Sequence, residues 1–179
     1  MRRIMAVLVE NNPGVLARVA SLIRRRGFNI ESLAVGPTEN PRIARITLVV
    51  EGDGPTYEQV QKQLYKLIEV LKVSDLDPDR SVARELALIK VHADPARRPQ
   101  LLQLAEVFRA RVVDVGRRQM TLEVTGTEDK VEALINLARE FGLLEVVRTG
   151  VIALERGPQS VRFGKEEAEN VPDVLRLGR

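Results

Sequence analysis

The order strand, helix, strand, strand, helix, strand occurs twice in this 179-residue chain, and this repetition restricts the fold more than any other feature. Strands are predicted where apolar residues form short runs or alternate with polar ones, and helices where they recur every three or four residues. The segments of the first copy are residues 4–9, 15–26, 28–35, 43–50, 60–71 and 73–76. Breaks rich in Gly, Pro, Asn and Asp separate several of them.

The second copy follows in the same order. Its segments are residues 86–91, 101–108, 112–115, 120–125, 127–141 and a final strand within 144–154, expected to be interrupted near Gly150. Each copy has the split βαβ order of a ferredoxin-like domain. The sequence therefore predicts an α+β fold, with two tandem ferredoxin-like βαββαβ units whose antiparallel sheets carry helices on one face.

Turn-rich segments indicate the domain boundaries. Residues 1–77 are predicted as the first domain, 78–82 as a linker and 83–157 as the second domain. The Gly-Pro pair at its end opens a tail, residues 158–179, whose one apolar patch is too short to fold alone. A flexible tail is favoured over a segment that docks on the domains.

The cysteine and histidine content excludes several kinds of disulfide, metal and catalytic site. The chain has no Cys and a single His, His92. A disulfide framework, a cysteine nucleophile and a Cys/His zinc site are therefore excluded, and a Ser-His-Asp triad would need His92 as its base. His92 follows a strand and has no cluster of carboxylates, which favours a surface residue at a strand end. We expect no catalytic residue and no metal ligand in this chain.

The chain has no sequence feature of a membrane or secreted protein. No uncharged run approaches the roughly 18 residues of a membrane-spanning helix. The N-terminal segment MRRIMAVLVENNPG has no small-residue cleavage site and continues directly into a strand pattern. We expect a cytoplasmic protein without a membrane partner.

Nucleic-acid binding is the class of function that the charge and the fold would suggest together. The chain has 28 basic and 25 acidic residues, a net charge of +3 and a pI near 9.5. RNA-recognition domains stack bases on aromatic side chains of their central strands. The central strands predicted here, within 7–9 and 43–50, contain no aromatic residue. We therefore expect no nucleic-acid partner.

The turn between the first strand and the first helix is the most informative candidate site. Asn11 or Asn12 could N-cap the helix, and Pro13 suits its first turn. Gly14 is unusual, because glycine there destabilises a helix by roughly 1 kcal/mol relative to alanine, yet it lets a ligand approach the backbone. Free N–H groups at a helix start bind anions, and an Asn amide adds a donor and an acceptor, so the turn could hold a zwitterion. From the turn alone, a well-capped helix with a tight entry is the favoured interpretation.

Asn29 is the second unusual residue, because asparagine is disfavoured at the start of a strand. Its side chain either bonds to the local backbone after Gly27 or faces a ligand beside the apolar Ile30. The residues alone leave these two alternatives open.

Several segments resemble one family. Residues 2–41, RRIMAVLVENNPGVLARVASLIRRRGFNIESLAVGPTENP, resemble the start of the small, regulatory subunit of acetolactate synthase (acetohydroxyacid synthase). Their motif N-x-P-G-V-L-x-R is shared by many ACT domains, which are ferredoxin-like modules that sense small molecules, whereas GFNIESLAVGPT (27–38) is more specific to this subunit. The segments QKQLYKLIEVLKVSDL (61–76) and RELALIKV (84–91) are also similar to it. The resemblance covers residues 1–157.

The resemblance implies a non-catalytic subunit that activates a catalytic, large subunit and confers feedback inhibition by valine or another branched-chain amino acid. Thiamine diphosphate, Mg²⁺ and FAD would belong to that catalytic subunit, so this chain is expected to bind no cofactor. In the family, ACT domains, here residues 1–77, pair side by side as a homodimer with the effector between them. Carried onto this sequence, the loop side of the effector site consists of Asn11, Pro13, Gly14, Val15 and Leu16, and the strand side of Asn29 and Ile30.

Two other classes of function compete with this one. A free-standing ACT-domain sensor that regulates transcription or another enzyme would carry the same turn but would not co-purify with a catalytic subunit. A small enzyme is disfavoured, because no nucleophile–base pair or metal constellation is visible in the sequence.

Overall fold

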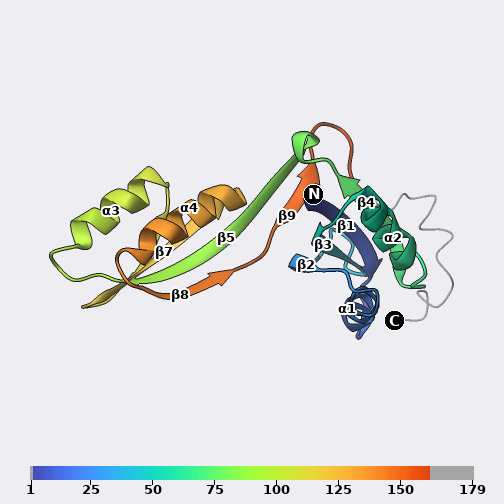
Figure 1. Cartoon of the computed structure of the whole chain (residues 1–179), viewed down its shortest axis with the longest axis horizontal. Coiled ribbons are helices and arrows are strands. Elements are labelled where there is room, and N and C mark those ends of the chain that lie inside the picture. The colour runs from blue at the N-terminus through green and yellow to red at the C-terminus, as the bar shows by residue number, and fades with distance from the viewer. Residues whose placement is uncertain (1, 162–179) are drawn as a thin grey trace. The chain divides into compact units, whose positions relative to one another are not determined.

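Two separate apolar cores divide the chain into two units. The computed structural model describes residues 2–161 (Figure 1). Among these, unit 1 comprises residues 2–82 and 153–161, and unit 2 comprises Ala83–Ile152. Each unit has its own antiparallel sheet and its own core. Unit 2 is therefore inserted into the chain of unit 1.

Unit 1 is a four-stranded antiparallel sheet with two helices. Its elements are β1 (Arg2–Glu10), α1 (Val15–Arg25), β2 (Ile30–Pro37), β3 (Ile43–Glu51), α2 (Gly54–Leu64) and β4 (Val70–Leu76). The strand order is β2-β3-β1-β4, and each neighbouring pair is antiparallel. β1 and β3 are the internal strands and are buried over most of their length, which explains their nearly continuous apolar sequences.

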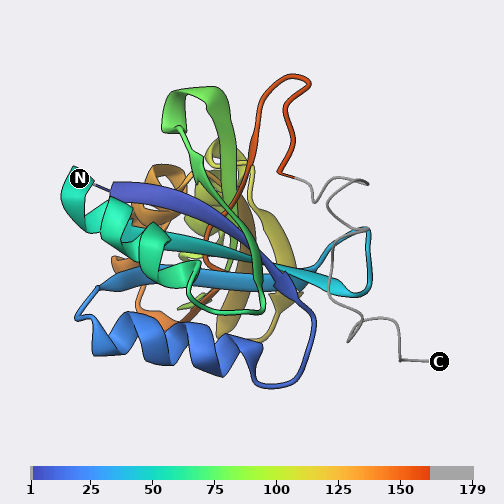
Figure 2. The ribbon, with the colours of Figure 1, turned by 90° about the vertical axis from the view of Figure 1, so that its right-hand side faces the viewer.

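Both helices cover the same face of this sheet, and Figure 2 shows them beside the strands. Alternate residues of β1 and β3 point to this face, because side chains of a strand alternate between its two sides. α1 and α2 contribute residues at helical spacing. Buried members of this core include Met5, Val7, Val9, Val19, Ile23, Ile46, Leu48, Val60 and Leu64.

The other face of the unit 1 sheet is partly covered by the end of the described chain. Ala6, Leu8 and Val49 alternate with the core residues and are also buried. Arg45 lies on the same face of β3 and donates from Nη2 to the carbonyl oxygen of Ala153 at 2.5 Å. Burial lowers the pKa of Arg45. The segment after unit 2 thus returns to the sheet of unit 1.

Unit 2 repeats the architecture of unit 1. After a short 3₁₀ helix η1 (Pro78–Arg80), its elements are β5 (Ser81–His92), α3 (Arg98–Val107), β6 (Arg111–Val115), β7 (Gln119–Gly126), α4 (Glu128–Arg139) and β8 (Leu143–Arg148). The strand order β6-β7-β5-β8 is equivalent to that of unit 1, and β9 (Ile152–Glu155) pairs with β5. The predicted α+β fold of two tandem βαββαβ units is confirmed.

Unit 2 begins at the predicted residue 83 but ends earlier than the predicted second domain. The expected linker 78–82 is ordered as η1 and the start of β5. The second domain is expected to run to residue 157, whereas residues from Ala153 onward belong to unit 1. The reason is a set of contacts that local sequence does not reveal: Arg45 donates to the carbonyl of Ala153 at 2.5 Å, and the N–H of Arg156 donates to the carbonyl of Arg80 at 2.8 Å. Of the predicted tail, residues 162–179 lie outside the described residues.

The interruption predicted near Gly150 is present between β8 and β9. Gly150 adopts φ +79°, a left-handed conformation that glycine tolerates without strain. The hydroxyl of Thr149 donates to the Gly150 carbonyl at 2.9 Å. The final strand of the prediction is therefore two strands separated by a turn.

The second helix lies earlier in the chain than predicted. The prediction of a helix over 60–71 is wrong in its second half, where α2 ends and β4 begins. The hydroxyl of Tyr65 bonds to the N–H and the carbonyl of Val73 at 3.1 and 3.2 Å, which fixes the chain reversal. At the other end the helix starts earlier, because the Asp53 carboxylate accepts from the Thr56 N–H at 2.9 Å.

Phe28 belongs to the end of α1 and not to β2. Gly27 has φ +71°, and its N–H donates to the carbonyl of Arg24 at 3.1 Å. The N–H of Phe28 donates to the carbonyl of Ile23 at 3.3 Å, which completes a Schellman motif. The predicted helix stop at Gly27 is confirmed, and the start of β2 moves from Phe28 to Ile30.

Candidate functional site

α1 begins without a side-chain cap. Its N-cap residue is Gly14, which is left-handed with φ +85° and ψ −9°, and Pro13 lies before the helix. The prediction that Asn11 or Asn12 caps the helix is wrong, because Gly14 turns the chain between them and the first helical residue. Asn12 Nδ2 instead donates to Glu10 Oε2 at 2.9 Å. The N–H of Val15 donates to the carbonyl of Asn12 at 3.4 Å. No side-chain cap and no acidic residue is present in the first turn, so its other backbone N–H groups retain the capacity to bind an anion.

The rim of this turn is fixed by Asn11. Its N–H donates to the carbonyl of Arg42 at 2.8 Å, and its Nδ2 donates to the carbonyl of Pro41 at 2.9 Å. Asn11 is nevertheless exposed. A Cβ built on Gly14 would meet no atom within 4 Å, so the space beside the glycine is open. The turn is therefore held in place by the β2–β3 loop and remains accessible.

The two apolar residues that follow the turn have different surroundings. Val15 is 4% exposed and packs in the core of unit 1, whereas Leu16 is 42% exposed. In a single copy of the chain, Leu16 is therefore the one of this pair that can contact a ligand. Val15 anchors the first turn of α1 to the sheet.

Asn29 and Ile30 lie at the opposite end of the sheet from Asn11. Ile30 is opposite Val50 in β3, and Val50 is opposite Arg3 near the start of β1. Asn11 follows the other end of β1. Asn29 is exposed, and Ile30 is partly buried against the core. One copy of the chain does not bring the two halves of the expected site together.

An ion pair behind the turn was not predicted from the sequence. Arg18 Nη1 contacts Glu69 Oε1, and the Glu69 side chain is only 10% exposed. Arg18 is the last residue of the motif N-x-P-G-V-L-x-R, and its place in that motif is the sequence signal that could have marked it as a site residue. Glu69 lies before β4 and has no sequence pattern that marks it.

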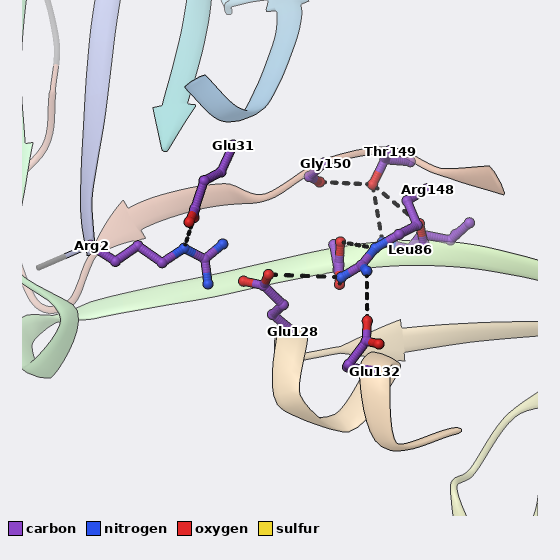
Figure 3. Close-up of polar contacts among 9 residues, drawn as sticks. Arg2, Glu31, Leu86, Glu128, Glu132, Arg148, Thr149 and Gly150 are labelled. Carbon is purple, nitrogen blue, oxygen red and sulfur yellow. Dashed lines mark hydrogen bonds and ion pairs between the residues drawn. The ribbon is translucent and has the colours of Figure 1, made fainter. Parts of the chain in front are cut away.

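In unit 2, the most extensive ion cluster that the described residues contain surrounds Arg148 (Figure 3). Its Nη2 and Nε lie 2.5 and 3.1 Å from the two carboxylate oxygens of Glu85, and its Nη1 lies 3.0 Å from Glu132 Oε2. Glu128 is 4.0 Å away. Hydrogen bonding to Glu85 is the main cause that raises the pKa of Arg148. The cluster joins β5, β8 and α4.

His92 is the last residue of β5 and is exposed, so the interpretation as a strand-end surface residue is confirmed. Between residues 2 and 161, no three His, Cys, Asp or Glu side chains are grouped so as to hold a metal ion. Across the same residues, every helix is too short or too polar to span a membrane.

The fold and the glycine turn of unit 1 define an ACT-containing protein: residues 5–72 match a family model described as "AHAS small subunit-like ACT domain". Residues 84–157 match a second model, "Small subunit of acetolactate synthase". The chain belongs to the family of acetolactate synthase small subunits.

Similar proteins span almost the same length. A relative from Archaeoglobus fulgidus, named "Probable acetolactate synthase small subunit", is 58% identical over 88% of this chain and 98% of its own. The acetolactate synthase small subunit of Mycobacterium leprae is 52% identical over 88% of this chain and 93% of its own. The crystal structure of the acetolactate synthase small subunit from Thermotoga maritima has a TM-score of 0.83 and 44% identity, and covers 89% of this chain and 99% of its own.

Proposed function

We propose that this chain is the regulatory subunit of an acetolactate synthase and that valine, or another branched-chain amino acid, binds between the ACT domains of two copies. The observation that carries the proposal is the open, uncapped turn at Gly14, whose backbone N–H groups suit a carboxylate. Asn11 at its rim adds an amide for the ammonium group or the carboxylate.

The topology of unit 1 supports a site made by two copies. β2 is an edge strand, and β2 runs parallel to β1 because both are antiparallel to β3. Edge strands present unpaired backbone groups that a second strand can satisfy. If two copies pair through antiparallel β2 strands, the start of β2 in one copy meets the end of β2 in the other. Asn29 of the second copy then comes to the sheet end that carries Asn11.

In that arrangement, each side of the site has a distinct role. The start of α1 and Asn11 bind the charged groups of the amino acid, and Asn29 of the second copy assists. Leu16 and Ile30 of the second copy supply the apolar contact for a branched side chain. One methylene changes affinity by only about 1–3 kcal/mol, so valine, leucine and isoleucine are expected to overlap as ligands.

Ligand binding across two copies is coupled to how those copies pair. A ligand that prefers one arrangement of the dimer stabilises it at the expense of others. We infer that this coupling is the means by which the effector changes the support that the dimer gives to a catalytic subunit. Thiamine diphosphate, Mg²⁺ and FAD are assigned to that catalytic subunit, and the complex to the cytoplasm.

The proposal is tested by calorimetry and by reconstitution. The purified full chain is titrated with valine, leucine and isoleucine, and acetolactate formation by the catalytic subunit is then measured with and without this chain and with valine. Activation together with inhibition by valine is the expected result. Absence of binding heat and of any effect on the catalytic subunit would contradict the proposal. Binding without co-purification of a catalytic subunit would instead identify a free-standing sensor.

A further inference from the structure

Backbone hydrogen bonds hold the turn at Gly14 at both of its ends, one to the residue before β4 and one to α1, and one ion pair joins these two places. At the first end, the N–H of Glu10 donates to the backbone carbonyl of Glu69 at 2.9 Å. At the second end, the N–H of Arg18 donates to the carbonyl of Gly14 at 3.1 Å. Arg18 Nη1 contacts the carboxylate of Glu69. Glu10 through Gly14 are therefore enclosed in a ring closed by this ion pair.

The Glu69 carboxylate is largely buried, so its ion pair with Arg18 affects the stability of this part of unit 1. The Glu69 side chain is 10% exposed, whereas that of Arg18 is 61% exposed. A largely buried carboxylate needs a counter-charge or hydrogen bonds, because its desolvation is otherwise uncompensated. Arg18 supplies that charge from the second turn of α1, so the start of α1 is drawn toward the loop before β4.

We propose that Glu69 and Arg18 are positioning residues of the effector site: their ion pair sets the conformation of the Glu10–Gly14 turn and thereby the direction of the N–H groups that receive the effector carboxylate. This inference rests on the proposed function. The pair needs no contact with the ligand. Its effect is on how well the turn is arranged before binding, which determines how much ordering the ligand must supply.

The test compares valine binding by full-length variants in calorimetry. Glu69→Gln and Arg18→Met each remove one charge of the pair, and both are expected to weaken valine binding about tenfold while the dimer persists. Glu58→Gln is the matched control, because it removes a charge from an exposed pair of the same unit, Glu58 with Lys62 at 3.4 Å. This control is expected to bind valine as the wild type does.

The charge exchange Arg18→Glu with Glu69→Arg separates positioning from general destabilisation. Recovery of most of the lost affinity in this double variant is expected, since the ion pair is restored in reverse. Unchanged valine affinity in both single variants would overturn the inference, as would a folded double variant that binds no better than they do. If Glu69→Gln does not fold, valine binding by Arg18→Met, a substitution at an exposed position, decides the test. Absence of valine, leucine and isoleucine binding by the wild type would refute the proposed function instead.

Discussion

Replacement of Arg148 by methionine should destabilise unit 2 strongly. The variant keeps most of the apolar side chain but leaves the Glu85 carboxylate, whose side chain is 2% exposed, without its bidentate partner. Breaking a buried ion pair in this way costs about 3–5 kcal/mol. Because Arg148 is itself 30% exposed, water can reach part of the site, and the lower end, about 3 kcal/mol, is expected. For a domain of this size, that loss lowers the melting temperature by about 12–24 °C.

Calorimetric melting of the full chain measures this change, and hydrogen exchange in β5 and β8 shows that unit 2 is the part affected. Glu132→Gln is the control, because the Glu132 side chain is 47% exposed and such an ion pair contributes about 0–1 kcal/mol. The double variant Glu85→Leu with Arg148→Met should regain most of the stability, since neither charge is then left unpaired. A melting temperature of Arg148→Met close to that of the wild type would refute this reasoning.

Three further changes test unit 1. Gly14→Asp should abolish valine binding, because the added negative charge occupies the position of the effector carboxylate. The dimer should persist in light scattering, because the space beside Gly14 is open. Gly14→Asn has the same shape without the charge and should bind valine better than Gly14→Asp does. Asp53→Ala should lower the urea midpoint at neutral pH and not at strongly acidic pH, since the bond from Thr56 lowers the pKa of Asp53 and its stabilising effect is lost on protonation. Burial, then the charge of Asp75, raises the pKa of Tyr57, so stability should fall above about pH 10 as the unfolded chain ionises, and less so in Tyr57→Phe.

The order of helices and strands could be predicted because the local spacing of apolar residues indicates each element. β1 and β3 are buried on the face that the helices cover and largely on the other face as well. Their nearly continuous apolar runs therefore identify them clearly as strands. The region after Leu64 was ambiguous, because its apolar positions fit a helical stripe as well as a strand. Pairing of Val73 with Val7 in β1 decided it, and that contact is distant in sequence.

The candidate site was predictable as a set of unusual residues but not as an arrangement. Gly14 was identified correctly as an irregular position, yet its role as a left-handed N-cap depends on backbone angles that sequence does not specify. Arg18 and Glu69 are 51 positions apart, and no local pattern connects them. The sequence places Asn11 after the first strand and Asn29 before the second, but no residue pattern shows that a second copy is needed to bring them together.

The insertion of unit 2 into unit 1 determines how the two halves of this protein can be separated. A chain cut after residue 82 would lose residues 153–161 and with them the carbonyl that Arg45 binds. Excision of residues 83–152, with a short Gly-rich bridge in their place, would keep both segments of unit 1 in one polypeptide. Isolation of unit 1 therefore calls for an internal deletion and not a truncation.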